Sequence, residues 1–374
     1  MTMTAKQLAL AIAGAGLLTI YGCADGGGTS TTDMASLPAN LLGEPALSNC
    51  AAVRSGRYNQ ILLVPSGPSF PDKVKKVVID AVAGTVTDIS GSGTITASDE
   101  ACHSTISGGT DFVVSPAGVM VMRFGQGTTK YLAISVPEQK FTLADMAGTW
   151  NSLGMDSAIP GANQGTASSV TFNSAGAVTA IKQCRNAATW DVTNCVDVTT
   201  GLPSLAGDLD GGFFVLDATK AIMGRMFAYK AGNGDVMAAW VTTSDQFNLF
   251  TRQRSNSLPA VGAVTTHWNL QMDSLLTSPS AATAFSNTIL SVDPTAASWV
   301  HSRKTVGATD AHRETLFANK PRDGYTFRPA GTALAADGTT ATFGEFTSLD
   351  FRGMGLSVLL LPAEKGFSFS VAQP

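Results

Sequence analysis

Residues 168–184, SSVTFNSAGAVTAIKQC, place two runs of β-branched and other apolar residues on either side of a turn built of small and polar residues. Val170 and Phe172 alternate with polar residues, as in a strand with one buried face. Similar runs, broken by Gly, Asn, Asp and Pro about every 8 to 12 residues, fill most of the chain. The sequence therefore predicts an all-β fold. Only residues 69–78 and 279–287 also suggest a short helix.

Four features recur three times in the same order, which indicates three divergent β-rich units. An aromatic residue followed by Asn comes first, then a hairpin pattern, then a glycine with an aromatic strand, and last an apolar strand. The pairs are Tyr58–Asn59, Trp150–Asn151 and Trp268–Asn269, and the closing strands are KYLAISVP (130–137), VMAAWVTT (236–243) and LSVLLLPA (356–363). These marks are a domain's length apart, so we predict units over residues 41–140, 141–255 and 256–374.

Each unit is long enough for about six to eight strands, which suits a small barrel or sandwich. Blades around a single axis are the alternative arrangement, although propellers typically have at least about four blades. We interpret Tyr58, Trp150 and Trp268 as core aromatics and the Asn after each as a turn cap. A ligand-lining role for the three aromatics is the alternative interpretation.

The stretch GTW at residues 148–150 resembles the Gly-x-Trp that opens the first strand of lipocalins and avidin-like barrels. The resemblance covers three residues, and the other units have GRY and THW at the matching places. It implies a lipocalin-like carrier of small apolar ligands, with Trp150 or Trp268 lining an apolar pocket in its unit.

Four cysteines follow Cys23, namely Cys50, Cys102, Cys184 and Cys195, and an even number in an oxidising compartment favours disulfides. Of the three pairings, we favour Cys50 with Cys102 and Cys184 with Cys195, because each pair then lies inside one unit. Zinc binding is the rival interpretation. The chain has no CxxC or Cys/His pair at ligand spacing apart from His103 beside Cys102, so we predict no metal site.

The N-terminus, MTMTAKQLALAIAGAGLLTIYGC, has one charge at Lys6 and an apolar run from Leu8 to Ile20. The run is shorter than the about 20 residues of a membrane-spanning helix, and it has the plan of a signal peptide. The final IYGC resembles the lipobox of bacterial lipoproteins through Ile20, Gly22 and Cys23. The resemblance implies that residues 1–22 are removed and that Cys23 is acylated. It also implies that Ala24, after the acylated Cys, favours export to the outer membrane, and it leaves open which face of that membrane the protein occupies. Residues 23–40 are then a flexible, glycine-rich tether.

Composition limits the partners of the chain. Charged residues make up only 14% of it and the net charge is -4, whereas nucleic-acid binding requires clustered Lys and Arg. We therefore predict no nucleic-acid partner, no cofactor, and contact with the membrane through acyl chains on Cys23. The identity of a protein or small-molecule partner is left open.

Motifs for catalysis are scarce, since the chain has no GxSxG elbow, HExxH helix, P-loop or GxGxxG after a strand. The best cluster is residues 299–325, where His301 and His312 with Asp310 offer a general base and an orienting carboxylate if a hairpin brings them together. A solvated strand pair is the simpler interpretation of this cluster. Asp208 and Asp210 lie in a turn that lacks EF-hand spacing, and Asp99 and Glu100 suit another exposed turn.

These observations favour a lipid-anchored envelope protein that acts as a binding or structural β-module rather than as an enzyme. A lipocalin-like carrier of apolar ligands and an envelope hydrolase with its site in residues 301–314 are the two alternatives.

Overall fold

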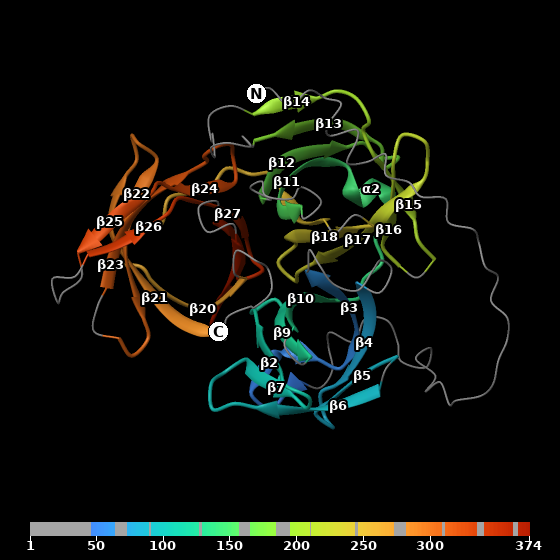
Figure 1. The fold of residues 1–374 in the computed structure, drawn as a ribbon, viewed down its shortest axis with the longest axis horizontal. Helices are drawn as coiled ribbons and strands as arrows, with labels where there is room; N and C mark the ends of the chain where they lie inside the picture. Colours follow the sequence, from blue (N-terminus) through green and yellow to red (C-terminus); the bar gives the residue numbers. More distant parts are fainter. Residues whose placement is uncertain are drawn as a thin grey trace.

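The computed structural model describes residues 46–63, 73–89, 91–126, 129–156, 165–184, 195–209, 211–243, 246–272, 282–308, 311–334, 340–361 and 366–374. The strands in these segments form three large antiparallel sheets and two small hairpins. The three large sheets surround a common centre, with the third on the left of Figure 1, the second at the upper right and the first below. The predicted all-β fold is confirmed. Cys23 and the predicted signal peptide and tether lie outside the described residues.

The first sheet is a closed barrel in which each strand pairs with the next and β10 returns to β3. A short hairpin, β1 (Ala46–Leu47) with β2 (Cys50–Arg54), precedes it. The barrel strands are β3 (Gly56–Leu63), β4 (Val74–Asp80), β5 (Thr85–Asp88), β6 (Gly91–Ala97), β7 (His103–Ile106), β8 (Thr110–Val114), β9 (Met120–Gln126) and β10 (Thr129–Pro137).

The second sheet has nine strands in the order β14-β13-β12-β11-β19-β18-β17-β16-β15. It curls until the end strand β15 meets the start of β13, through a bridge between Ala177 and Ser204. Its strands are β11 (Gly148–Asp156), β12 (Gly165–Phe172), β13 (Val178–Gln183), β14 (Val196–Val198), β15 (Ser204–Gly207), β16 (Phe213–Leu216), β17 (Ile222–Lys230), β18 (Val236–Thr242) and β19 (Gln246–Arg252).

The third sheet is again a closed barrel, formed by β20 to β24 and β27 to β29. A separate hairpin, β25 (Gly331–Leu334) with β26 (Thr340–Phe343), is inserted between β24 and β27. The barrel strands are β20 (Val264–Met272), β21 (Thr283–Asp293), β22 (Ser298–Thr305), β23 (Ala311–Ala318), β24 (Tyr325–Arg328), β27 (Phe346–Phe351), β28 (Leu356–Leu361) and β29 (Gly366–Ala372).

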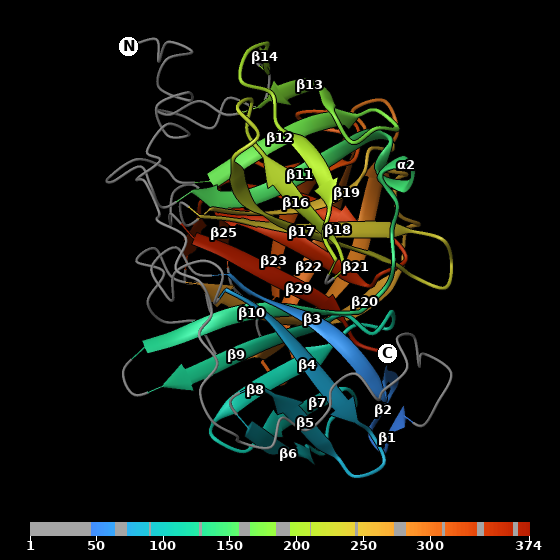
Figure 2. The same ribbon diagram turned by 90° about the vertical axis from the view of Figure 1, so that its right-hand side faces the viewer.

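One hydrophobic core joins all three sheets where their outer faces meet. It contains side chains from β3 and β10 of the first barrel, from β11 and β17 to β19 of the second sheet, and from β20 and β27 to β29 of the third barrel. The second view shows the three sheets stacked closely around this region (Figure 2). Because residues i and i+2 of a strand share a face, a junction strand that also lines an apolar interior must be apolar on both faces.

The apolar closing strands of the sequence, β10, β18 and β28, all contribute to this shared core. In β18, Met237, Ala239 and Val241 face the shared core, whereas Ala238 packs inside the second sheet. The corresponding strand β10 contributes Leu132 to the shared core. Two-sided burial therefore explains why β10 and β18 lack a regular alternation of polar and apolar residues.

Aromatic side chains connect each pair of sheets at the junction. Tyr229 Oη donates to the carbonyl of Ala117, which joins the second sheet to the first barrel. Tyr325 Oη donates to the carbonyl of Ser168 at 2.6 Å, which joins the third barrel to the second sheet. The ring of Trp268 lies 5.0 Å from that of His103, between the third and first barrels. The three sheets are therefore tied by specific contacts as well as by apolar burial.

The two disulfides link Cys50 to Cys102 and Cys184 to Cys195, which is the pairing favoured from the sequence. Each closes a loop within the segment that supplies one sheet, so neither crosses the junction between sheets. The first ties the β1–β2 hairpin to the turn before β7. The segment between the second pair, residues 185–194, lies outside the described part of the chain.

Neither of the two stretches that suggested a short helix is helical in the described residues. Residues from Val74 and from Thr283 onward form β4 and β21, so the two helix candidates are strands where the structure describes them. The one helix among the described residues is α2 (Leu143–Met146), which a capping box between Thr142 and Asp145 begins. That Thr-x-x-Asp spacing is visible in the sequence and could have located it.

The asparagines after the three aromatics do not cap turns, because all three lie inside strands. Asn59 Oδ1 accepts from Lys76 Nζ at 2.6 Å. Asn151 Oδ1 accepts from Ser169 Oγ at 2.7 Å, and Asn269 Oδ1 accepts from Ser368 Oγ at 2.6 Å. Each Asn therefore satisfies a cross-strand polar group within a sheet.

We expect Phe367→Ala to lower the free energy of unfolding by about 3 to 5 kcal/mol, because truncating a fully buried Phe leaves a cavity. Phe367 belongs to the third barrel, and its ring lies 4.8 Å from Phe247 of the second sheet. Urea unfolding followed by fluorescence and circular dichroism should show one earlier transition for the whole chain. Val306→Ala, at an exposed position, is the control. A loss below about 1 kcal/mol, or separate melting of the third barrel, would contradict a shared core.

Candidate functional site

The interior of the third barrel contains a cavity of about 490 Å³. All eight strands of the barrel contribute side chains to its wall, and residues 256–259 of the segment before β20 complete it. Most of the lining residues have polar side chains: Asn256, Ser257, Thr265, His267, Asn269, Asn287, His301, Arg303, Glu314, Thr326, Ser348, Asp350, Arg352, Ser357 and Ser370. The cavity lies within the size range of small-molecule sites.

Strand alternation explains how the barrel acquires a polar interior. In β20, Trp268 and Leu270 face the shared core, so His267 and Asn269 face the cavity. The interiors of the other two sheets are filled instead by buried apolar side chains, such as Phe112 in the first and Phe213 in the second. The third barrel therefore has its apolar surface outside, toward its neighbours, and its polar surface inside.

A buried ion-pair network occupies one wall of the cavity. His301 on β22 lies directly across from Glu314 on β23, and their side chains meet at 3.0 Å between Nε2 and Oε2. Arg328 Nη1 donates to the other carboxylate oxygen, Oε1, at 2.9 Å. Burial opposes ionisation of Glu314, but the hydrogen bond from His301 and the charge of Arg328 outweigh it and lower its pKa. Glu314 is thus held as a carboxylate with both oxygens engaged.

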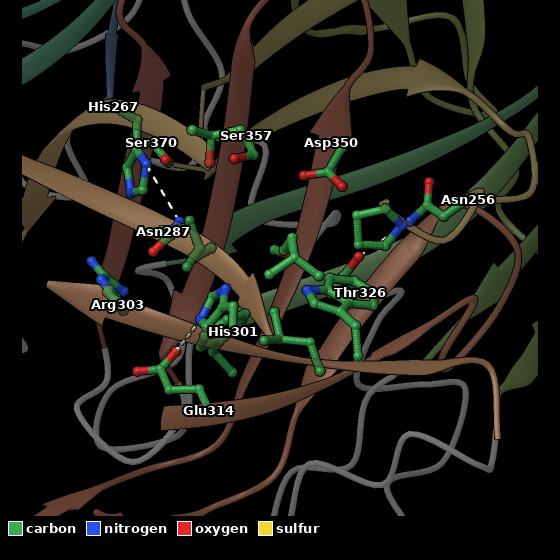
Figure 3. Close-up of a pocket in the computed structure, with 18 of the residues that line it drawn as sticks. Asn256, His267, Asn287, His301, Arg303, Glu314, Thr326, Asp350, Ser357 and Ser370 are labelled. Carbon is green, nitrogen blue, oxygen red and sulfur yellow. Dashed lines mark hydrogen bonds and ion pairs between the residues drawn. The ribbon is translucent and has the colours of Figure 1, made fainter. Parts of the chain in front are cut away.

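Three polar residues, Arg303, His267 and Asn287, lie at the end of the cavity opposite Asp350 (Figure 3). The Arg303 guanidinium lies 4.1 Å from the centre of the Phe285 ring. Burial lowers its pKa, which marks a guanidinium removed from bulk water. Among the described residues, no carboxylate lies within ion-pair distance of Arg303.

His267 is held neutral beside this arginine. Asn287 Nδ2 donates to its Nδ1 at 3.5 Å, while Asn287 Oδ1 is buried with no hydrogen-bond partner among the described residues. Burial, followed by the positive charge of Arg303, lowers the pKa of His267 to about 3. His267 therefore offers a neutral imidazole to the cavity near pH 7.

Asp350, Asn256 and Thr326 lie on the other side of His301 (Figure 3). Asn256 Nδ2 donates to Thr326 Oγ1 at 3.2 Å, and Arg352 Nη2 donates to Asn256 Oδ1 at 3.0 Å. Burial raises the pKa of Asp350 and the nearby charge of Arg352 only partly opposes this effect. The two ends of the cavity thus differ in charge and in hydrogen-bonding character.

The predicted cluster of residues 301–314 is brought partly together. His301 faces the cavity as the hairpin prediction requires, but its carboxylate partner is Glu314, and Asp310 lies outside the described residues. His312 lies across from Arg303 rather than from His301, and its Nδ1 is buried without a partner in the described structure. The hairpin that the sequence suggested is present, and the acid that contacts His301 in it is Glu314.

The three aromatics of the sequence pattern are all buried, and none of them lines this cavity. Tyr58 and Trp150 pack inside the first and second sheets. Trp150 Nε1 donates to the carbonyl of Met146 at 2.8 Å, and the Arg252 guanidinium lies 4.1 Å from its ring centre. Trp268 faces the shared core instead, and Asn269 faces the cavity. In the third unit the aromatic residue therefore points out of its barrel, whereas in the first two units it points inward.

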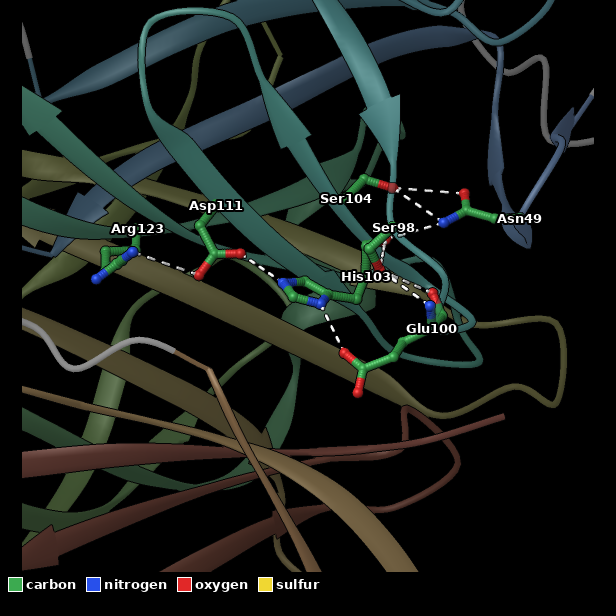
Figure 4. A network of polar contacts seen from close by, with 7 residues as sticks. All are labelled: Asn49, Ser98, Glu100, His103, Ser104, Asp111 and Arg123. Atoms are coloured by element: carbon green, nitrogen blue, oxygen red, sulfur yellow. Dashed lines mark hydrogen bonds and ion pairs between the residues drawn. The ribbon is translucent and has the colours of Figure 1, made fainter. Parts of the chain in front are cut away.

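His103 has a structural environment rather than a catalytic one (Figure 4). Its Nε2 contacts Asp111 Oδ1 at 2.6 Å and its Nδ1 contacts Glu100 Oε2 at 3.0 Å. The hydrogen bond to Asp111 is the largest influence on this histidine and raises its pKa. Because carboxylates engage both ring nitrogens, neither is available to take a proton from a nucleophile. Cys102 beside it is in a disulfide, which removes this pair as a metal site.

The remaining polar candidates are Asp208 and Asp210. Asp208 forms an ion pair with Arg225, and Asp210 lies outside the described residues. Across the described segments, no group of three His, Cys, Asp or Glu side chains has the spacing of a metal site. No helix in the part of the chain that the structure describes has the length and hydrophobicity needed to cross a membrane.

No family model and no curated protein matches this chain. Among solved structures, it is similar to a Trp-176-Ala mutant of the vaccine antigen Transferrin Binding Protein B from Haemophilus parasuis Hp5. The similarity has a TM-score of 0.24 and 8% identity, and covers 85% of this chain and 75% of that chain. A likeness at this level carries no argument about the ligand of this chain.

We expect His267→Gln to flatten the pH dependence of stability between pH 6 and pH 4. The unfolded histidine binds a proton below its ordinary pKa of 6.5, whereas the folded one stays neutral down to about 3. The wild type therefore loses up to about 1.4 kcal/mol of stability per pH unit from this residue as the pH falls. Urea unfolding at several pH values measures the difference. Parallel curves for the two proteins would show that His267 titrates normally.

Proposed function

We propose that this chain is a lipid-anchored binding protein of the cell envelope whose third barrel encloses the site for a small polar molecule. The acyl chains on Cys23 hold it at the outer membrane, and the first and second sheets support the barrel that binds. The proposal concerns binding, and it assigns no catalytic step to the cavity.

The polar interior of the third barrel is the observation that carries this proposal. Burying polar and charged groups costs stability unless each finds a partner, so a barrel selected only for stability would be filled with apolar side chains. The first and second sheets are filled in this way. The third instead keeps a cavity with Arg303, Asp350 and the open acceptor Asn287 Oδ1 in its wall. A bound polar ligand supplies the partners that the protein does not.

This arrangement favours a polar ligand over the apolar one of a lipocalin-like carrier. The tryptophans proposed to line an apolar pocket are packed elsewhere, Trp150 inside the second sheet and Trp268 in the shared core. The apolar side chains of the cavity wall are the group of Trp299, Leu316, Phe346 and Leu359, together with Leu258, Pro259 and Ile289. Such a wall suits a ligand with one apolar face and several hydrogen-bonding groups.

A hydrolase is the second candidate, because a histidine with an orienting carboxylate faces the cavity. We rank it below binding, since Arg328 engages the same carboxylate and no Ser, Thr or Cys side chain in the described structure donates to His301. Activity toward any substrate that disappears in His301→Ala and persists in His312→Ala would reverse this ranking.

The membrane attachment predicts that protein extracted from membranes begins at an acylated Cys23. Intact mass and peptide mapping should show the acyl mass on Cys23, and Cys23→Ala should release the protein into the soluble fraction. An unprocessed N-terminus with a free Cys23 thiol would remove the anchor from the proposal and leave the cavity unaffected.

The binding role predicts that filling the cavity abolishes capture of a small molecule. Purified protein dialysed against a mixture of water-soluble metabolites should retain a ligand, identified by mass spectrometry after denaturation. Ser357→Phe places a ring in the cavity and should remove the ligand, while the folded state persists in circular dichroism. Ser302→Phe, on the outward face of β22, is the matched control. Retention of no ligand, or equal retention by Ser357→Phe, would contradict a binding function.

A further inference from the structure

We propose that the ligand of the third barrel is a small acidic sugar or a closely similar hydroxylated carboxylic acid, with its carboxylate bound by Arg303. This inference rests on the proposed binding function and adds the chemical class of the ligand. Three features of the wall carry it: a guanidinium without an acidic partner at one end, hydroxyl and amide groups along the sides, and an apolar patch with an aromatic ring.

The anionic group is assigned by the charges in the wall. Glu314 is already neutralised by Arg328 and contacts His301, so it leaves Arg303 without a carboxylate within ion-pair distance in the described structure. A guanidinium binds a carboxylate through two parallel hydrogen bonds, which neither a neutral ligand nor a cation offers. The guanidinium also lies 4.1 Å from the centre of the Phe285 ring, a cation–π contact that helps to hold it in the cavity wall.

The hydroxyl groups are assigned by the side chains between the two ends. Ser348, Ser357, Ser370, Thr326 and Asn269 come from five different strands and line the same cavity. Hydroxyl side chains both donate and accept, and Asn287 Oδ1 adds a buried acceptor that lacks a donor. A ligand with several hydroxyls matches such a wall, whereas a simple dicarboxylate offers acceptors only.

Asp350 makes the far end of the cavity favour a hydroxyl group of the ligand over a second carboxylate. Burial raises the pKa of this carboxyl, and the charge of Arg352 partly opposes that effect. A hydroxyl group can donate to a carboxylate here or accept from a protonated carboxyl, so it is tolerated in both states. A second carboxylate at this end would be repelled by Asp350 whenever that carboxyl is ionised. The wall therefore favours one acidic group rather than two.

An apolar patch completes the match to a sugar ring. Trp299, Leu316, Phe346 and Leu359 pack together beside the ion-pair network and face the cavity. A pyranose has one face made mainly of C–H bonds, which packs on aromatic and aliphatic side chains while the hydroxyls at its rim form hydrogen bonds. The cavity of about 490 Å³ accommodates a monosaccharide together with bridging water.

Isothermal titration calorimetry on the purified full chain tests the class with three matched probes. D-Glucuronate carries the carboxylate and the hydroxylated ring, D-glucose keeps the ring and lacks the carboxylate, and succinate keeps carboxylates and lacks the ring. We expect D-glucuronate to bind at least about tenfold more tightly than either control, because a charge-assisted bidentate pair and several hydroxyl contacts must both be satisfied.

Two arginine variants locate the carboxylate. Arg303→Gln should weaken D-glucuronate binding by about 10- to 100-fold and leave the weak binding of D-glucose unchanged. Arg303→Lys keeps the charge but loses the bidentate geometry, so it should fall between the two. Arg313→Gln is the control, since Arg313 lies on β23 next to Glu314 and its side chain is exposed. Circular dichroism and urea unfolding establish that each variant is folded.

Each other outcome overturns a defined part of the inference. Equal binding of D-glucose and D-glucuronate, with no effect of Arg303→Gln, removes the carboxylate. Equal binding of succinate removes the hydroxylated ring. If no probe binds while the metabolite mixture yields a ligand that Ser357→Phe excludes, the class is wrong and the binding function stands. If the mixture also yields none, both fail.

Discussion

The shared core at the junction of the three sheets is the constraint on which the rest of the structure depends. A small sheet that closes on itself can bury its inner face alone, but these sheets also bury part of their outer faces against one another. Every strand at the junction must therefore supply an apolar face to the centre, whatever its other face does. Burial on this scale is the dominant favourable term in folding, and here it is obtained between sheets as well as inside them.

This constraint allows the third barrel to have a polar interior. Its strands β20 and β27 to β29 direct their large apolar residues, such as Leu349 and Phe369, outward to the common centre. The outer contacts stabilise the barrel, so its inner face is free to carry charged and hydroxylated side chains around a cavity. The same two-sided arrangement separates the residues that stabilise the chain from those proposed to bind a ligand.

The sequence predicted the class of fold because alternation and turn residues are local signals. Helix α2 was not predicted, because a four-residue helix has no periodicity, although its capping residues Thr142 and Asp145 were visible. The cavity was only partly predictable. His301 was identified because titratable residues gather around it in a chain with few charges. Its pairing with Glu314 depends on strand register, and Arg328 comes from another strand. Trp268 shows the same limit, because a shift by one residue between units reverses the face that an aromatic presents.

The shared core also has a consequence for the order in which the chain is made. A chain that emerges from its N-terminus completes the first two sheets before β20 to β29 exist. Until the third barrel arrives, the outer faces of β3, β10 and β17 to β19 expose buried-type residues such as Ile61, Phe247 and Leu249 to water. An unfinished chain thus exposes an apolar surface that only its last hundred or so residues can cover. A chain truncated near the C-terminus is therefore expected to aggregate rather than to form a smaller folded protein.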